Sequence, residues 1–319
     1  MLTKRESMID LIPFLASMAV LLLGSNFLVN YSVKLAKKMH ISPLIIGATA
    51  VAIGTSIPEM VVTINSSLAG KGALATGNIV GANIANIGLI LGLSFLFGKI
   101  RVGTEKTQIL ARLVFLSGAL FTALVILCGG ISRLWAVALL IIAAGVFSWE
   151  IYAGERGGKA EDASLFTEKN IKIEPLPIVA SIVAFSVLAI YLSGQVFVSS
   201  ALKLAQFFHI QIAIFGLTAV SLGTTLPELT TSLLAVFKKE GKLILGNMLG
   251  SIIYNFLLVA GLGGVISALP SISLSSIAMV LFMTSLLALL LLLYKGKVIP
   301  RYWGGLFLLG YLFFLSLSL

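Results

Sequence analysis

Apolar stretches of about 20 residues, separated by short polar and mostly basic segments, repeat along the whole chain. A helix needs about 20 predominantly apolar residues to cross a bilayer. The pattern therefore predicts an all-α membrane protein with ten transmembrane helices. The predicted spans are 9–30, 43–68, 74–98, 108–127, 134–152, 175–197, 211–236, 243–266, 273–293 and 302–319.

The second half of the chain repeats the first without a gap. GATAVAIGTSIPE (47–59) matches GLTAVSLGTTLPE (216–228), and GNIVGANIANIGLILGL (77–93) matches GNMLGSIIYNFLLVAGL (246–262). When residue n is set beside residue n+169, 24 of the 60 positions from 34 to 93 are identical. Internal repeats of this kind are a common way to build transporters.

Each half holds five predicted spans, an odd number, so the second half enters the membrane from the opposite side. We therefore predict two inverted five-helix repeats, at 1–153 and 175–319, with substrate bound at the repeat interface near the midplane. The polar residues 154–174 form a cytoplasmic linker that is too short for a domain of its own.

Composition agrees with a membrane protein, since 59% of residues are hydrophobic and only 11% are charged. A soluble domain has about 25% charged residues. Of the 22 basic residues, 16 lie in alternate loops on one side of the predicted bundle. The positive-inside rule assigns that side to the cytoplasm and both termini to the outside of the plasma (cell inner) membrane. The net charge of +10 thus reports topology, and no nucleic-acid partner is predicted.

Only two of the twelve acidic residues, Glu59 and Glu228, lie deep inside predicted spans, and they are 169 residues apart. A charged side chain at the centre of a membrane helix costs roughly 2.5–3.5 kcal/mol on insertion scales. No Lys or Arg lies at the same depth to compensate. Two such carboxylates favour a mobile cation as their partner.

Oxygen-bearing groups surround both glutamates. Pro58 and Pro227 precede them, and a proline inside a helix frees backbone carbonyls of the preceding turn. We expect freed carbonyls in 52–55 and 221–224. Hydroxyl groups lie three or four residues before each Glu, on its face of the helix, at Thr55, Ser56, Thr224 and Thr225. Carboxylate, hydroxyl and carbonyl oxygens are the ligands that Ca²⁺ prefers.

A second repeated motif, Gly-Asn-x-x-Gly, opens the third and eighth spans. Its glycines are spaced by four and predict close helix packing. Asn86 and Asn255 are repeat-equivalent amides in mid-span, where a polar group needs partners, so they are candidate ligands or helix-to-helix hydrogen bonds. Asn78 and Asn247 lie near the predicted span starts and are interpreted as helix caps.

The doubled G-T-[ST]-[IL]-P-E and G-N-x-x-G-[AS]-x-I-x-N motifs resemble the α-repeats of the cation/calcium antiporter superfamily, and most of all its prokaryotic Na⁺/Ca²⁺ exchangers. The resemblance implies ten helices and exchange of several Na⁺ for one Ca²⁺ by alternating access. It implies Glu59 and Glu228 as central ligands of both ions. The further ligands that it implies are hydroxyls of Thr55, Ser56, Thr224 and Thr225, carbonyls of Ala52 and Ser221, the amides of Asn86 and Asn255, and Ser251.

Two positions depart from the family's pattern. Some Na⁺/Ca²⁺ exchangers have Asp where this chain has Asn255, and many have Ser where it has Ala82. The site then carries two acids and a charge of −2 when both are ionised. One Ca²⁺ or two Na⁺ neutralise that charge, so the departure bears on stoichiometry, ion selectivity and proton competition.

Three other functions stay open at this stage. A Ca²⁺/H⁺ or other cation/H⁺ antiporter on the same scaffold would use the same glutamates, because buried carboxyl groups titrate readily. A cation channel is favoured less, since channels use symmetric subunits more naturally than inverted repeats. An intramembrane enzyme lacks support, because the spans hold no HExxH motif, Ser/His pair or paired aspartates. No cofactor and no obligatory protein partner are predicted.

Overall fold

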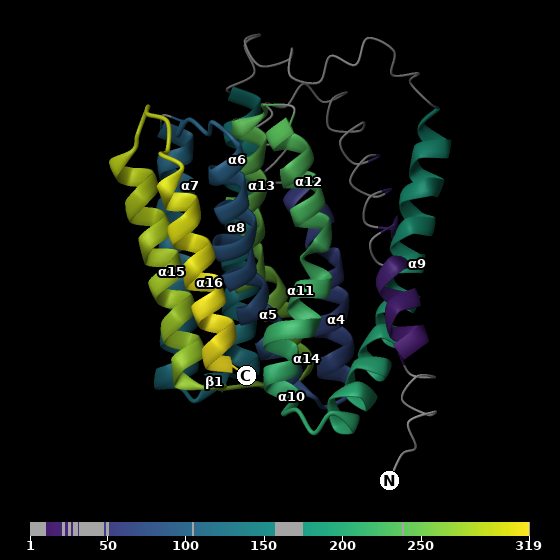
Figure 1. The fold of residues 1–319 in the computed structure, drawn as a ribbon. Coiled ribbons are helices and arrows are strands. Elements are labelled where there is room, and N and C mark those ends of the chain that lie inside the picture. The colour runs from purple at the N-terminus through teal and green to yellow at the C-terminus, as the bar shows by residue number, and fades with distance from the viewer. Residues whose placement is uncertain are drawn as a thin grey trace.

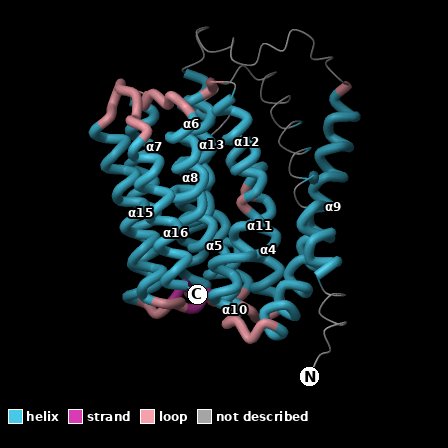
Figure 2. The backbone as a smooth tube through the Cα atoms, viewed as in Figure 1, coloured by secondary structure: helices cyan, strands magenta, loops and turns pink. Residues whose placement is uncertain are grey.

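The computed structural model of this protein describes residues 11–20, 23–24, 27, 31, 48, 51–103, 105–156, 175–237 and 239–318. Nearly all of these residues are helical (Figures 1 and 2). The strands described are β1 (Gly130–Ile131) and β2 (Leu269–Pro270), which pair antiparallel at one end of the bundle. The predicted all-α fold is therefore confirmed for this part of the chain.

The first half contributes, after the apolar helix Leu11–Val20, the elements α3 (Ala52–Thr55), α4 (Ile57–Leu68), α5 (Gly72–Ala85), η2 (Asn86–Leu91), α6 (Gly92–Phe97), α7 (Glu105–Leu127) and α8 (Arg133–Arg156). The second half contributes α9 (Leu176–Phe207), α10 (Ile212–Phe215), η4 (Gly216–Val220), α11 (Ser221–Thr224), α12 (Leu226–Phe237), α13 (Gly241–Tyr254), η5 (Asn255–Val259), α14 (Ala260–Ile266), α15 (Leu274–Leu293) and α16 (Tyr302–Ser318). The η elements are π-helical turns that continue the helices on either side of them.

Five of the described helices are long and apolar enough to cross a membrane. They are Gly72–Phe97, Glu105–Leu127, Arg133–Tyr152, Gly241–Ile266 and Leu274–Leu293. The pair Ile212–Thr224 and Leu226–Phe237, bent by 41°, counts as a sixth if it is one span. These six agree closely with predicted spans. The predicted first span is described only at 11–20, 23–24 and 27, and most of the linker lies outside the described residues, so the count of ten stays a prediction.

The predicted sixth span differs from the structure at its end. It was expected to stop at residue 197, whereas α9 continues to Phe207. The extra turns are amphipathic: Ala201 and Leu204 are buried, whereas Lys203 is exposed. A helix with one apolar stripe is stabilised by packing that stripe against the bundle, and average hydrophobicity does not reveal this.

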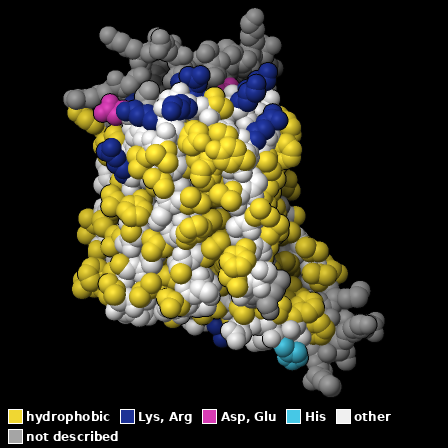
Figure 3. Space-filling model, turned by 60° about the vertical axis from the view of Figure 1, so that its left-hand side comes forward, with side chains coloured by type: hydrophobic (Ala, Val, Ile, Leu, Met, Phe, Trp, Pro, Cys, Tyr) yellow, Lys and Arg dark blue, Asp and Glu magenta, His cyan; other side chains and the backbone are white. Residues whose placement is uncertain are grey.

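The helices of the two repeated motifs lie inside the bundle, and the others surround them. In the 18-residue apolar stretch of the helix Gly72–Phe97, 83% is buried inside the protein, and in that of Gly241–Ile266 the buried share is 78%. The corresponding share for Arg133–Tyr152, in α8, is only 22%. Apolar side chains cover much of the outer face between the two ends (Figure 3). The repeated motifs are therefore held away from the surrounding medium, and α8 borders it.

Candidate ion-binding site

Each predicted glutamate lies just after a break in a helix. α3 ends at Thr55 and α4 starts at Ile57, with Glu59 in its first turn. In the second repeat α11 ends at Thr224 and α12 starts at Leu226, with Glu228 in its first turn. The start of a helix carries partial positive charge from unpaired N–H groups, which favours a carboxylate there. The breaks thus place both acids where the backbone partly stabilises them.

Proline makes these breaks possible, because Pro58 and Pro227 have no N–H to continue the hydrogen-bond ladder. The carbonyls of Ala52 and Ser221 were expected to be freed, but in this structure each accepts bonds. Ala52 accepts from the Ser56 amide at 3.0 Å and the Thr55 hydroxyl at 3.3 Å. Ser221 accepts in the same way from Thr225 and Thr224, at 3.0 and 3.1 Å. Either carbonyl would have to exchange a bond before it could hold an ion.

The two glutamates come together from opposite halves of the chain. Both side chains are fully buried, and Glu228 lies near enough to Glu59 for their charges to repel each other. The hydroxyl of Ser56 donates to Oε1 of Glu228 at 3.2 Å, so a first-repeat residue contacts the second-repeat acid. Thr224 of the second repeat faces Glu59 in turn. Among the side chains whose burial is described, no Lys or Arg is buried.

The Ser56 hydroxyl bonds to Glu228 instead of capping its own helix, which its local sequence would allow. Ser-x-x-Glu is the capping-box pattern, in which the first hydroxyl caps its own helix. Ser56 makes no such cap to α4. Its hydroxyl is used across the repeat interface instead.

A pair of matching hydrogen bonds joins the repeats beside the glutamates. The Thr55 hydroxyl donates to Oδ1 of Asn247 at 3.3 Å, and the Thr224 hydroxyl donates to Oδ1 of Asn78 at 3.2 Å. Thr224 is the repeat equivalent of Thr55, and Asn247 is the repeat equivalent of Asn78. The two bonds are therefore the same contact made twice, in opposite directions across the interface.

The interpretation of Asn78 and Asn247 as helix caps is wrong. α5 begins at Gly72 and α13 at Gly241, six residues earlier in each case. Both amides are buried at the repeat interface. The sequence held a signal for this, because Asn78 lies eight residues before Asn86, and residues i and i+8 share one face of a helix.

Asn86 and Asn255 each open a π-helical turn, η2 and η5. π-turns are rare and are frequent at functional sites, because they turn side chains away from the regular helical positions. η2 packs against α12, the helix of Glu228, and η5 packs against α4, the helix of Glu59. Each predicted amide ligand thus lies on an element that packs against the helix carrying the acid of the other repeat.

Many polar atoms of this region have no hydrogen-bond partner among the described residues. They are both carboxylate oxygens of Glu59, Oε2 of Glu228, the side-chain oxygen and nitrogen of Asn86 and Asn255, and the hydroxyl of Ser251. Buried polar groups are normally hydrogen-bonded, so orphaned ones need an explanation. Ser251 faces Glu228. The hydroxyls of Ser221 and Thr225 instead donate to their own helix, at Leu217 O and Leu222 O.

Glycine allows the two repeats to approach this closely. A Cβ at Gly81 would overlap the carbonyl oxygen of Leu217 and lie 2.5 Å from the Ser221 hydroxyl. At the repeat-equivalent Gly250, a Cβ would lie 2.8 Å from the Cβ of Ala52. The predicted packing role is confirmed for Gly77, Gly81 and Gly250, and the contact that each makes is one across the repeats.

A third buried acid was missed. Glu150 was assigned to a span end, but α8 continues past it, and its side chain is fully buried. The hydroxyl of Tyr254 donates to its Oε2, whereas Oε1 has no partner. Tyr254 directly precedes Asn255, so this acid holds the residue next to a predicted ligand. Sequence gave no hint, because Glu150 follows Trp149 at what reads as the membrane edge.

Replacing Tyr254 by Phe should destabilise the protein, because it leaves the buried Glu150 carboxyl without its donor. An orphaned buried polar group costs about 1–3 kcal/mol. The thermal unfolding midpoint of purified protein in detergent measures the effect. The double variant Glu150→Leu/Tyr254→Phe, which removes both partners, should recover most of the loss. Equal midpoints for the single and double variants would contradict this account.

Comparisons with known proteins agree with this arrangement. The family model of the sodium/calcium exchanger protein matches residues 10–149 and 178–319. An uncharacterized membrane protein of Methanocaldococcus jannaschii is 33% identical over 302 residues, covering 94% of each chain. The sodium/calcium exchanger MaX1 of Methanosarcina acetivorans is 28% identical over 341 residues, covering 96% of this chain and 97% of its own.

Solved structures give the same result. The sodium-calcium exchanger NCX_Mj, soaked with 10 mM Na⁺ and 10 mM Sr²⁺, superimposes with a TM-score of 0.72 at 30% identity. The match covers 97% of this chain and 98% of that one. NCX_Mj soaked with 2.5 mM Na⁺ and 0.1 mM Ca²⁺ gives 0.71 at 29% identity. By sequence and by fold, this chain belongs to the sodium/calcium exchanger family.

Proposed function

We propose that this protein is a secondary active antiporter that exchanges Na⁺ for Ca²⁺ by alternating access. Na⁺ and Ca²⁺ compete for one site between two inverted five-helix repeats, ten transmembrane helices in all. Glu59 and Glu228 are the central ligands. The remaining ligands are Thr55, Ser56, Thr224, Thr225, Asn86, Asn255 and Ser251, with the carbonyls of Ala52 and Ser221.

One observation carries this proposal: two fully buried carboxylates interact with each other, with orphaned oxygen atoms around them. Two ionised acids in a low-dielectric interior repel one another, and their desolvation costs several kcal/mol each. A cation bound between them offsets both terms. Carboxylate, hydroxyl and amide oxygens suit Ca²⁺ and Na⁺, which are hard cations.

Charge neutralisation supplies the coupling. The doubly ionised, empty site would carry a buried charge of −2, which is costly to seal from water. One Ca²⁺ cancels that charge, and so do two Na⁺. Only the neutralised protein then switches between its outward-open and inward-open forms, so each passage carries an ion. Because the empty protein does not switch, the transport of one ion is coupled to the return of the other, and neither ion passes uncoupled.

Orientation follows from the basic residues. In the described structure, Lys and Arg side chains gather at one end of the bundle (Figure 3). We assign that end to the cytoplasm by the positive-inside rule. Both termini and the turn around Lys71 then lie outside the cell membrane, and residues 154–174 form a cytoplasmic linker.

Flux measurements test the proposal. Purified protein in proteoliposomes loaded with Na⁺ should take up ⁴⁵Ca²⁺ when diluted into Na⁺-free medium of the same pH. Uptake should stop when Na⁺ is equal on both sides. A pH gradient alone, without Na⁺, should drive no uptake.

The opposite pattern would replace this proposal by a Ca²⁺/H⁺ antiporter on the same scaffold. In that case a pH gradient would drive uptake and a Na⁺ gradient would not. Uptake without any counter-ion would instead indicate a channel. Matched liposomes without protein give the background for each condition.

A further inference from the structure

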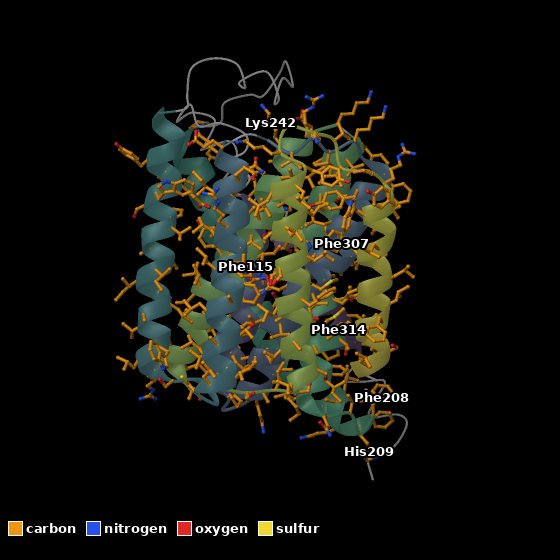
Figure 4. All side chains as sticks on the ribbon, turned by 90° about the vertical axis from the view of Figure 1, so that its left-hand side faces the viewer. Phe115, Phe208, His209, Lys242, Phe307 and Phe314 are labelled. Atoms are coloured by element: carbon orange, nitrogen blue, oxygen red, sulfur yellow. The ribbon has the colours of Figure 1, made fainter. Side chains whose placement is uncertain are left out.

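A pocket of about 440 Å³ opens at the basic end of the bundle, far from the buried glutamates. It lies where α6 and α12 end and α13 and α16 begin. Figure 4 shows Lys242, in the first turn of α13, at this end, and His209 at the opposite one. The pocket is lined by Phe97, Gly98, Lys99, Ile100, Val236, Phe237, Lys239, Gly241, Ile244 and Arg301.

The charged groups of this pocket all have the same sign. Lys99, Lys239 and Arg301 line it, and no acidic residue is among the described residues of its lining. Glu240 follows Lys239 in the chain but does not line the pocket. α13 also begins here, and the start of a helix favours an anion. The electrostatics therefore suit a ligand with negative charge.

The rim of the pocket is apolar and faces outward. The side chains of Phe97 and Phe237 are 65% and 77% exposed. Ile244 and Val236, which also line the pocket, are buried. A ligand that fits here has an anionic part for the cations and an apolar part that runs down beside the two phenylalanines. A phospholipid has both parts.

Lys239 has an unusual backbone conformation. Its φ is +60°, in the left-handed region, where a side chain costs roughly 1–2 kcal/mol. The equivalent residue of the first repeat is Gly70, with φ +68°. Both turns make the same hydrogen bonds: Gly70 N to Ser67 O and Lys239 N to Val236 O. Glycine is the usual residue in such a helix-ending turn.

The turn itself thus does not need a lysine. Lys99 likewise has an uncharged counterpart, Ala268, in the other repeat. The corner on the opposite side of the membrane is therefore built in the same way without these two charges. Lysine at position 239, despite its backbone cost, points to a role for the charge.

We infer that this pocket binds the phosphate headgroup of an anionic phospholipid, with Lys99, Lys239 and Arg301 around the phosphate and the acyl chains against Phe97 and Phe237. Basic pockets between transmembrane helices are a recognised way to hold such headgroups. The inference goes beyond ion exchange and does not depend on it.

Native mass spectrometry of the full chain in detergent, titrated with phosphatidylglycerol, tests this inference. Phosphatidylcholine and inorganic phosphate are titrated in parallel. Each basic residue near an anionic lipid contributes about 1 kcal/mol, so Lys239→Gly should weaken phosphatidylglycerol binding about five-fold. The triple variant Lys99→Gln/Lys239→Gly/Arg301→Gln should weaken it about a hundred-fold by the same reasoning.

Two further measurements distinguish a loss of lipid binding from a loss of protein stability or of surface charge in general. Without lipid, Lys239→Gly should melt at or above the wild-type temperature, because glycine relieves the left-handed strain. Lys295→Gln removes an exposed lysine that does not line the pocket, and it should leave binding unchanged.

Wild-type affinity of the triple variant for phosphatidylglycerol would overturn the inference. So would an equal loss on Lys295→Gln, which would reduce the effect to general surface charge. Inorganic phosphate that binds as tightly as the lipid would assign the pocket to a free anion and remove the lipid. None of these experiments measures ion flux. Their results therefore test the lipid inference even if the protein does not exchange Na⁺ for Ca²⁺.

Discussion

Glu59→Gln is expected to abolish Ca²⁺ uptake driven by a Na⁺ gradient. The substitution keeps the size of the side chain and removes one of the two negative charges that hold the ion. Opposite unit charges about 4 Å apart attract by about 4 kcal/mol at an effective dielectric constant of 20. Ca²⁺ carries two charges, so its affinity should fall at least about a thousand-fold, since each 1.4 kcal/mol is a factor of ten.

The measurement is the initial rate of ⁴⁵Ca²⁺ uptake in Na⁺-loaded proteoliposomes. Glu228→Gln should behave in the same way, since the two acids are equivalent in the repeats. Glu105→Gln is the matched control, because Glu105 is an exposed acid at the start of α7. Near-normal uptake by Glu59→Gln would remove this residue from the centre of the site.

Gly81→Ala is expected to prevent the two repeats from closing on each other. The added methyl group would overlap the Leu217 carbonyl, which belongs to the backbone of the other repeat and cannot rotate away. Overpacking of a tight core costs typically 1–3 kcal/mol, and more where backbone must move. We expect at least about 3 kcal/mol, and with it the loss of most folded protein and of exchange.

Gly145→Ala is the control for this substitution. Gly145 lies in α8, and a Cβ there would have no neighbour within 4 Å. Because alanine is about 1 kcal/mol better than glycine inside a helix, this variant should be as stable as the wild type or more so. Fluorescence-detected size-exclusion chromatography after heating compares the two. Equal stability of both variants would mean that the repeats are not packed as tightly as described.

The sequence was sufficient to predict where the acids lie and why the helices break beside them. A proline and an acid at matching positions of a repeat leave few alternatives, and Glu59 and Glu228 are buried at the repeat interface, where Ser56 bonds to Glu228. Most helix ends were also predictable to within a few residues, since apolar runs end where charges begin; the end of α9 at Phe207 is the exception. Both results rest on local patterns.

What the sequence could not supply were the contacts between the repeats. Asn78 was interpreted from its distance to a span start, whereas its partner, Thr224, lies 146 residues away. Glu150 looked like an interfacial residue, because nothing near it announces Tyr254, 104 residues on. The Ser56 hydroxyl was expected beside Glu59 of its own repeat, yet it bonds to Glu228 of the other. In each case the side chain bonds to a partner far away in the chain, which its neighbours in the sequence do not indicate.

The crossed pairs Thr55–Asn247 and Thr224–Asn78 mean that each half of the chain depends on the other for its buried hydrogen bonds. The asparagine oxygen in each half accepts its hydrogen bond from a threonine of the other half, so one half made alone would bury an amide oxygen without its donor. Two identical copies lying head to tail would satisfy each other. The fused chain thus keeps the bonding scheme of an antiparallel dimer within a single molecule.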